Sequence, residues 1–189
     1  MIRAIIFDCF GVLCRGSQDF LLSQTDSAQK QKIIDLNRAS DLGFLDRSEY
    51  ISLIAEELDV GSDFIETAMR TRHHRNEALI QFAWSLKNDY KIGLLSNVGT
   101  GVVEGIFTEH ELSTLFDTVV LSGQVGMEKP YFEIFELTAA RLRVEKSECI
   151  MIDDIETNID GARSTGMEGL LYYDNEQFET DFRKAIQHY

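Results

Sequence analysis

The chain begins MIRAIIFDCFGVLCRG (residues 1–16), and this stretch is the starting point for predicting the fold. Its short apolar run, residues 2–7, is typical of a buried β-strand. The run ends at Asp8, and Phe10 follows two residues later. An Asp directly after a strand is most often a helix cap or a turn former, so Asp8 alone predicts no function.

Four further segments have the composition of buried strands, namely residues 91–95, 118–121, 149–152 and 169–173. Helical patterns lie between them, including the apolar face formed by Leu79, Phe82, Ala83 and Leu86 and a second helix for which Pro130 is expected to be the first residue. Strands that alternate with helices predict an α/β fold with a parallel five-stranded sheet covered on both sides.

The connection between the first two strands is much longer than the sheet requires. It covers residues 8–90, which is more than seventy residues, whereas a dozen or more suffice for a parallel crossover. Residues 16–76 show helical patterns only: Asp46 with Glu49 predicts a capping-box start for one helix, and Ser62 is expected to cap the next. We therefore expect a core of residues 1–15 and 77–189 and an inserted helical cap of residues 16–76.

The composition and charge of the chain disfavour some classes of binding partner. The 189 residues include 32 acids and 18 bases, and a net charge of −14 disfavours nucleic acid and anionic membranes as partners. There is no apolar run of membrane-spanning length and no leader pattern, which predicts a soluble, cytoplasmic protein. The three cysteines (Cys9, Cys14 and Cys149) form no CxxC pair and are expected to be reduced thiols.

Polar residues follow four of the predicted strands, and parallel strands place their carboxyl ends at one edge of the sheet. These residues are Asp8, then Ser96 and Asn97, then Lys129, and finally Asp153 and Asp154. A carboxylate nucleophile, a hydroxyl, a cation and acids that hold a divalent metal are the groups that phosphoryl transfer needs. Mg²⁺ prefers oxygen ligands, which Asp8, Asp154 and a backbone carbonyl near residue 10 can provide.

Each of these residues has an ordinary structural explanation when it is taken singly. Lys before Pro is commonly an exposed extended residue, and the acidic pair can complement a helix dipole ahead of Asn158. The occurrence of all of them at strand ends along one edge is what favours a functional site.

Four motifs in order resemble those of the haloacid dehalogenase superfamily of hydrolases. They are FDCFGVL (residues 7–13), LLSN (94–97), GMEKP (126–130) and MIDDIETNIDGA (151–162). The resemblance covers nearly the whole chain and implies a Rossmann-like core with a small helical cap of the C1 type.

The resemblance also implies roles for individual residues. Asp8 would be the nucleophile that forms an aspartyl intermediate, while Ser96 and Lys129 would bind the transferred group. Asp154 would hold Mg²⁺ together with Asp8 and the carbonyl of Phe10, and Asp153 would lie close to the metal through a water molecule. Asn97, Phe10 and Asn158 are expected to border the substrate, with Asn158 also supporting its loop.

Phe10 departs from the family pattern, because phosphatases of this superfamily typically carry a second Asp there as the general acid and base. Such catalysis is commonly worth about 3–5 kcal/mol of barrier. Three readings stay open. The first is a phosphatase for small phosphorylated metabolites with good leaving groups, such as a sugar 1-phosphate. The second is a 2-haloacid dehalogenase, and the third is a protein that binds a phosphorylated ligand or a partner protein without turnover.

Cations in and around the cap are candidates for contacts to a phosphate or a sugar, namely Arg15, Arg70, Arg72, His73, His74 and Arg75. A solvated helix face explains the basic run at residues 69–75 equally simply. The sequence does not indicate the oligomeric state.

Overall fold

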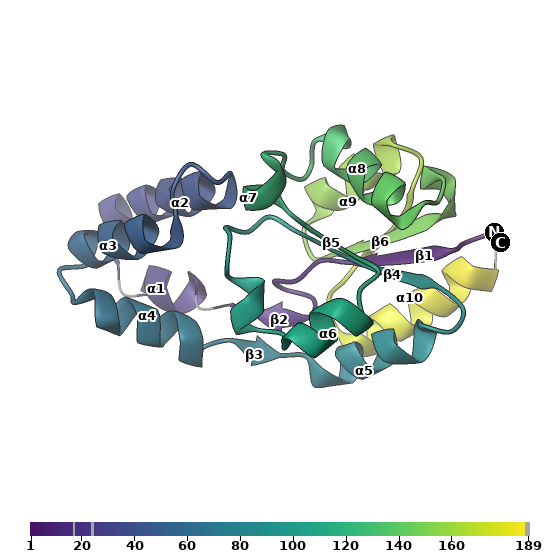
Figure 1. The fold of residues 1–189 in the computed structure, drawn as a ribbon, viewed down its shortest axis with the longest axis horizontal. Helices are drawn as coiled ribbons and strands as arrows, with labels where there is room; N and C mark the ends of the chain where they lie inside the picture. Colours follow the sequence, from purple (N-terminus) through teal and green to yellow (C-terminus); the bar gives the residue numbers. More distant parts are fainter. Residues whose placement is uncertain (17, 24, 188–189) are drawn as a thin grey trace.

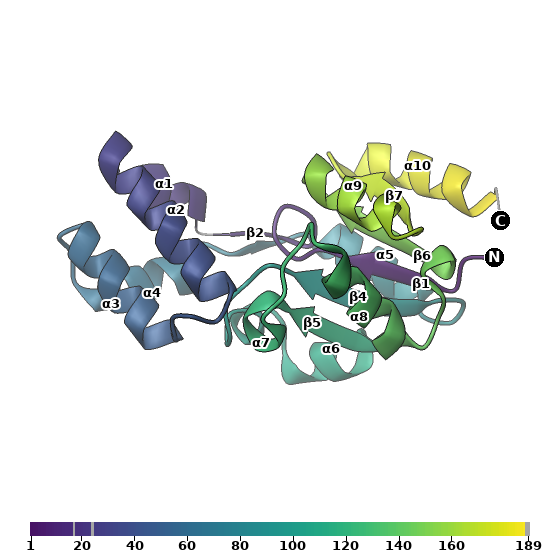
Figure 2. The ribbon, with the colours of Figure 1, turned by 90° about the horizontal axis from the view of Figure 1, so that it is seen from above.

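The computed structural model describes residues 1–16, 18–23 and 25–187, in which helices cover both faces of a parallel sheet (Figure 1, Figure 2). The strands are β1 (Ala4–Phe7), β4 (Lys91–Ser96), β5 (Thr118–Leu121), β6 (Cys149–Asp153) and β7 (Glu168–Leu171), in the spatial order β5-β4-β1-β6-β7. All four neighbouring pairs are parallel. This confirms the predicted α/β, Rossmann-like sheet.

The central strand β1 is buried on both faces because its alternate side chains enter two different apolar clusters. Ile5 and Phe7 pack with α5 (Glu77–Leu86) and α10 (Asn175–Gln187), whereas Ala4 and Ile6 pack with α8 (Phe132–Leu142) and α9 (Glu156–Ser164). Figure 1 shows these two helix layers on opposite sides of the sheet. The continuous apolar composition of residues 4–7 thus follows from burial on both sides.

Four helices form a separate group, which we call the helical subdomain. They are α1 (Gln18–Ser23), α2 (Ser27–Asp41), α3 (Arg47–Glu57) and α4 (Ser62–Thr71). Their apolar faces meet in a small core of their own, in which Ile33, Ile54 and Ile65 are fully buried. Figure 1 places this group beyond the carboxyl ends of the strands. The predicted domain limits at residues 16 and 76 stay a prediction.

The N-termini of α3 and α4 were both predicted from capping patterns in the sequence, and the structure tests both predictions. The capping box of α3 is confirmed, because the Asp46 side chain accepts hydrogen bonds from the amides of Ser48 and Glu49, and Glu49 accepts one from the Asp46 amide. The predicted Ser62 cap is wrong by one residue, since Gly61 is the N-cap of α4 and makes no side-chain cap bond.

The predicted first residue of α8 is also wrong, because the helix begins at Phe132 with Tyr131 as its N-cap. Pro130 lies instead in a turn that the Tyr131 amide closes on the Glu128 carbonyl. The remaining short elements are β2 (Cys14–Arg15), β3 (His74–Arg75), η1 (Val103–Gly105), α6 (Glu109–Thr114), α7 (Ser122–Val125) and η2 (Lys146–Glu148).

The antiparallel pair β2–β3 links the helical subdomain to the sheet. The sequence did not predict it, because two-residue strands are too short to show an alternating pattern. Asn76 fastens this junction. Its side-chain amide donates to the Val12 carbonyl at 3.1 Å and to the Tyr172 hydroxyl at 2.9 Å, while its carbonyl oxygen caps α5 at Leu79.

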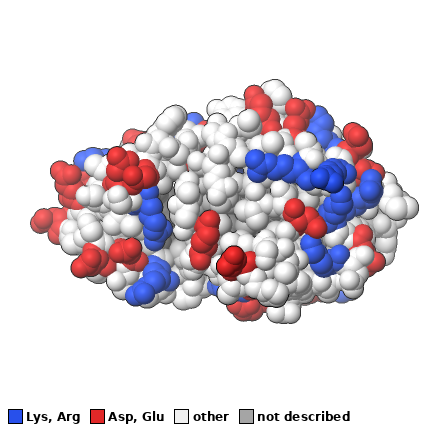
Figure 3. Space-filling view, in the orientation of Figure 1, with Lys and Arg blue, Asp and Glu red and all other residues white. Residues whose placement is uncertain are grey.

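Within the described part of the chain, no helix combines the length and the apolar character needed to cross a membrane. Figure 3 shows basic side chains interspersed with acidic ones on the face seen in Figure 1.

Asn76→Ala should lower the free energy of unfolding by about 2 kcal/mol, because it removes a helix cap and leaves buried partners unsatisfied. The exposed Asn88, in the turn after α5, provides a matched control, and Asn88→Ala should change stability by less than about 0.5 kcal/mol. Urea unfolding of both variants measures the difference. Equal losses would show that Asn76 does not fasten the junction.

Candidate active site

A buried lysine lies between two carboxylates at the carboxyl edge of the sheet. The Nζ atom of Lys129 is 2.9 Å from Oδ1 of Asp8 and 2.6 Å from Oδ2 of Asp153. The parallel register brings the two acids to one level, because Phe7 pairs with Ile152 on the neighbouring strand. The structure thus joins residues that lie far apart in the sequence in one charged cluster.

The charge balance of this cluster is incomplete. Burial raises the pKa of Asp8 to about 6, although Lys129 and a hydrogen bond from the Ser96 side chain act to lower it. Burial lowers the pKa of Lys129, but Asp8 and Asp153 raise it by more, so the ammonium keeps its charge. One ammonium therefore faces two buried carboxylates, and a further cation would stabilise Asp8 as the anion.

Two asparagines hold the cluster in place. The side-chain amide of Asn97 donates to the Lys129 carbonyl at 2.9 Å and accepts from the Lys129 amide at 2.8 Å. Asn158 donates to both carboxylate oxygens of Asp153, at 3.0 and 3.2 Å. Both asparagines also line the crevice described below. Their contacts show how the ammonium and the carboxylate are oriented, while the predicted contact with substrate stays a prediction.

The side chains of Asp8, Asp153 and Asp154 form an acidic trio, in which one oxygen of each lies within 4.8 Å of the others. Gly11 makes room for it, because a Cβ atom there would lie 2.1 Å from Oδ2 of Asp154. Gly11 also has φ +86°, a conformation that glycine adopts without strain. Carboxylate oxygens are hard ligands, so the residues present fit Mg²⁺.

Phe10 lies beside the acidic trio without adding a polar group. Its ring is 5.8 Å from the His73 ring, centroid to centroid, and it packs so closely on the backbone of Gly16 that a Cβ atom there would clash. Phe10 therefore forms an apolar wall between the acids and the helical subdomain. Its side chain has no proton to donate.

A crevice of about 780 Å³ opens over these residues, between the helical subdomain and the loops that follow the strands. Asp8, Phe10, Ser96, Lys129 and Asp154 all line it, so the sequence predicted its floor.

The candidate cations of the cap region have different surroundings. Arg15 and His73 line the crevice, and Arg70 lines a neighbouring cavity. Arg72 lies over the Phe20 ring. Arg75 forms an ion pair with Glu111 at 2.5 Å, so its charge is already neutralised within the protein. His74 is an exposed residue of β3.

Two residues that the sequence reasoning missed also line the crevice, Asp41 at the end of α2 and Arg47 at the start of α3. Neither lies in a strand-end motif. The sequence signals that mark them, an acid at a helix end and a base after a capping Asp, are common on any helical surface. Only the packing of the helical subdomain on the sheet brings them to the site.

The family model of haloacid dehalogenase-like hydrolases matches residues 2–166. The chain belongs to this family. A phosphatase from Mycobacterium tuberculosis is 28% identical over 130 residues, which are 66% of this chain and 60% of that protein. A fructose-1-phosphate phosphatase from Escherichia coli is 32% identical over 77 residues, 39% of this chain and 41% of that protein. The chain thus spans 60% and 41% of the lengths of these two relatives.

Solved structures share the fold of this chain. A family member from Porphyromonas gingivalis superposes with a TM-score of 0.81 over 98% of both chains, at 22% identity. A family enzyme from Bacteroides thetaiotaomicron, solved with magnesium and inorganic phosphate, has a TM-score of 0.77 over 92% of this chain and 95% of that one, at 20% identity.

Gly11→Ala should weaken Mg²⁺ binding by about tenfold to a hundredfold, because the new Cβ atom displaces the Asp154 carboxylate. Gly166→Ala is the matched control. Gly166 has a similar positive φ of +94°, but a Cβ atom there meets no other atom within 4 Å. The strain of a positive φ is thus common to both variants and the clash is not. Calorimetric titration with Mg²⁺ compares them, and equal affinities would contradict the assigned role of Gly11.

Proposed function

We propose that this protein is a Mg²⁺-dependent phosphatase for a small phosphorylated metabolite. The observation that carries the proposal is the buried Asp8 carboxylate, which faces the crevice beside a charged Lys129 and within the acidic trio. A nucleophile, a fixed cation and an oxygen-ligand set for Mg²⁺ together suit the transfer of an anionic phosphoryl group. The names of the relatives, both phosphatases, support the same class of reaction.

In the proposed reaction an oxygen of Asp8 attacks phosphorus, the ester P–O bond breaks, and the phosphoryl group is held on Asp8. Water then attacks phosphorus, which releases inorganic phosphate and restores the carboxylate. Lys129 offsets charge on the phosphoryl oxygens, and Ser96 donates a hydrogen bond to them. When bound at the acidic trio, Mg²⁺ would supply the additional positive charge that the cluster lacks.

The leaving oxygen is the demanding part of this reaction, because Phe10 replaces the usual acid. A leaving group of low pKa needs the least protonation, which favours sugar 1-phosphates among the possible substrates. The E. coli relative, by its name a fructose-1-phosphate phosphatase, supports a sugar phosphate as the substrate.

Two other functions follow from different readings of the same residues. Phe10 suits a 2-haloacid dehalogenase, because halide leaves without a proton. The acidic trio weighs against this reading, since a reaction without metal would leave its three carboxylates facing the single ammonium of Lys129. A protein that binds a phosphorylated ligand without turnover is the third reading, and activity assays separate it from the other two.

Asp8→Asn should reduce phosphate release by at least about a thousandfold, because it removes the nucleophile. The test uses a panel of phosphate esters and 2-haloacids, each assayed with Mg²⁺ and with a chelator. Asp89→Asn, at an exposed Asp in the loop before β4, should keep full activity. Halide release in the presence of chelator would favour the dehalogenase. Saturable binding of an ester without turnover would favour the binding protein.

A further inference from the structure

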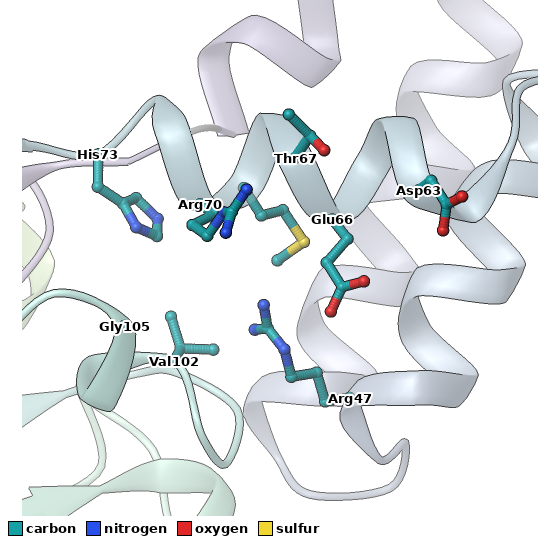
Figure 4. Close-up of a pocket in the computed structure, with 9 residues that line it drawn as sticks. Arg47, Asp63, Glu66, Thr67, Arg70, His73, Val102 and Gly105 are labelled. Carbon is teal, nitrogen blue, oxygen red and sulfur yellow. The ribbon is translucent and has the colours of Figure 1, made fainter.

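A second cavity, of about 460 Å³, adjoins the active-site crevice. The two share the lining residues Arg47, Met69, His73 and Val102, so they lie side by side. Figure 4 shows the Arg47 guanidinium reaching from α3 toward α4, and the His73 ring projecting into the same space. The floor of the crevice holds the proposed chemistry, and this side cavity lies toward the helical subdomain.

Arg47 has no protein partner in the part of the chain that the structure describes: it makes neither an ion pair nor a side-chain hydrogen bond there. Yet it is only partly exposed, and the chain has 32 acids against 18 bases. Glu66 and Asp63 line the same cavity, and Figure 4 shows the Glu66 carboxylate on the side of α4 that faces Arg47, but neither acid forms an ion pair with Arg47. A half-buried guanidinium without a partner loses hydration that an anionic ligand would restore.

His73 adds a second observation. Its Nδ1 atom is buried and has no hydrogen-bond partner. Burial lowers the pKa of the ring, with Arg47 and His74 acting in the same direction, so a neutral imidazole is available as a donor or an acceptor. An unsatisfied buried polar atom beside an unpaired guanidinium is costly unless a ligand contacts both.

We propose that Arg47 and His73 bind a second anionic group of the substrate, a carboxylate or a further phosphate, while its transferred phosphate lies at Asp8. This inference rests on the proposed function and narrows it to substrates with two anionic groups. The guanidinium fork suits a carboxylate or a phosphate bound through two parallel hydrogen bonds. Phe10 lines the same crevice and lies beside His73, so it offers an apolar surface to the carbon skeleton of the substrate.

The test compares matched pairs of esters in which one member carries a second anion: 2-phosphoglycolate against ethyl phosphate, 3-phosphoglycerate against glycerol 1-phosphate, and fructose 1,6-bisphosphate against fructose 1-phosphate. In at least one pair, the ester with the second anionic group should have a lower KM than its counterpart. Arg47→Met should remove that advantage, roughly tenfold to a hundredfold, and leave the counterpart's KM unchanged. Arg183→Met, at an exposed residue of α10, is the matched control.

Calorimetry with the Asp8→Asn protein measures binding of the same esters without turnover, so the second anion site is tested even if the proposed phosphatase activity fails. The site is supported if an ester with a second anionic group binds more tightly than its counterpart and Arg47→Met abolishes that preference. The inference is overturned if no ester with a second anionic group is preferred, or if Arg47→Met weakens the binding of both members of a pair equally.

A second inference concerns the proton that Phe10 cannot supply, and it stands on different residues. Apart from Asp8 and Asp154, the one carboxyl among the described residues that line the crevice is that of Asp41. It belongs to α2 of the helical subdomain, whereas the acidic trio follows strands β1 and β6 of the sheet, so Asp41 lines the crevice from a different part of the molecule.

The position of Asp41 is fixed by close contacts between α2 and the core. The Ser122 hydroxyl donates to the Asp41 carbonyl. A Cβ atom at Gly99 would lie 2.5 Å from Oγ of Ser40, and one at Gly43 would lie 2.6 Å from the Gly123 carbonyl oxygen. We call these contacts the glycine seam. The seam leaves no room for side chains, so the end of α2 lies against the loop after β4.

The surroundings of the Asp41 carboxyl favour its protonated form near neutral pH. Burial raises its pKa to about 7; a hydrogen bond from the Gly99 amide acts against this, and the charges of Glu128 and Asp8 add to it. The Tyr50 hydroxyl lies near Asp41 as well, and its own pKa is raised. No cation forms an ion pair with Asp41 in the described structure.

We infer that Asp41 is the general acid and base of this enzyme, in place of the residue that Phe10 replaces. As the P–O bond breaks, its electron pair stays on the leaving oxygen, which takes the proton of the Asp41 carboxyl. The resulting carboxylate then accepts a proton from the water that attacks the phosphoryl group on Asp8. Asp41 ends the cycle protonated, and no further reactant is needed.

Asp41→Asn should slow the transfer of the phosphoryl group from alkyl phosphates to Asp8 by about a hundredfold or more and spare the burst of p-nitrophenolate from p-nitrophenyl phosphate, whose leaving group needs no proton. Release of phosphate from Asp8 should slow for both classes of ester, because Asp41 is also the base of that step. The native kcat for alkyl esters should fall as the pH rises above about 7, because the acid form of Asp41 is lost. Asp41→Glu should restore part of the activity. Asp35→Asn, at an exposed residue of the same helix, is the control.

Equal losses in the rate of the first step, the burst of leaving group, on both classes of ester would assign Asp41 a structural role and overturn this inference. Unchanged rates on both would overturn it as well. Neither result depends on the second anion site, and hydrolysis of p-nitrophenyl phosphate by the Asp41→Asn protein would leave the proposed phosphatase activity in place.

Discussion

The ion pairs of buried Lys129 with Asp8 and Asp153 are the interaction on which the rest of the site depends. Removing three charges from water is costly, and only close pairing and further hydrogen bonds offset that cost. The parallel sheet provides the pairing by ending β1 and β6 at one level, and Asn97 and Asn158 provide the hydrogen bonds. The surplus negative charge of this cluster favours a further cation at this edge, and in the proposed function that cation would attract the phosphoryl group.

The floor of the site could be predicted from the sequence because each of its residues directly follows a strand. The shared position of Asp8, Ser96 and Asp153 follows from the parallel topology alone, because parallel strands place their carboxyl ends at one edge of the sheet. This holds independently of how the helices pack. The sheet itself was predictable for a similar reason, since strands buried on both faces show a continuous apolar run.

The residues of the helical subdomain could not be predicted in this way. Their distance from the crevice depends on how α2 and α3 pack on the core, and no local pattern encodes that packing. Arg75 illustrates the limit: its partner Glu111 lies 36 residues away, so the sequence could not show that its charge is already neutralised. Asp41 and Arg47 illustrate the opposite case, in which ordinary surface residues become part of a pocket.

The division of the site between the core and the helical subdomain also explains how the site can accommodate Phe10 in place of an acid. In the proposed mechanism the core supplies the nucleophile and the cations, and the helical subdomain supplies recognition and the proton. A change at Phe10 therefore affects one wall of the crevice, while the charged cluster beneath it keeps its hydrogen bonds.

The glycine seam fixes how closely the helical subdomain approaches the sheet. At Gly43, Gly99 and Gly123 the two parts of the molecule meet backbone to backbone or on a single hydroxyl group. The distance between the end of α2 and the loops after β4 and β5 is therefore set by these contacts, and a single added methyl group would act as a spacer. A larger residue at Gly43 or Gly99 would raise the helical subdomain over Asp8 without changing any residue of the charged cluster, so in the proposed function the seam would set the height of the chamber that the substrate enters.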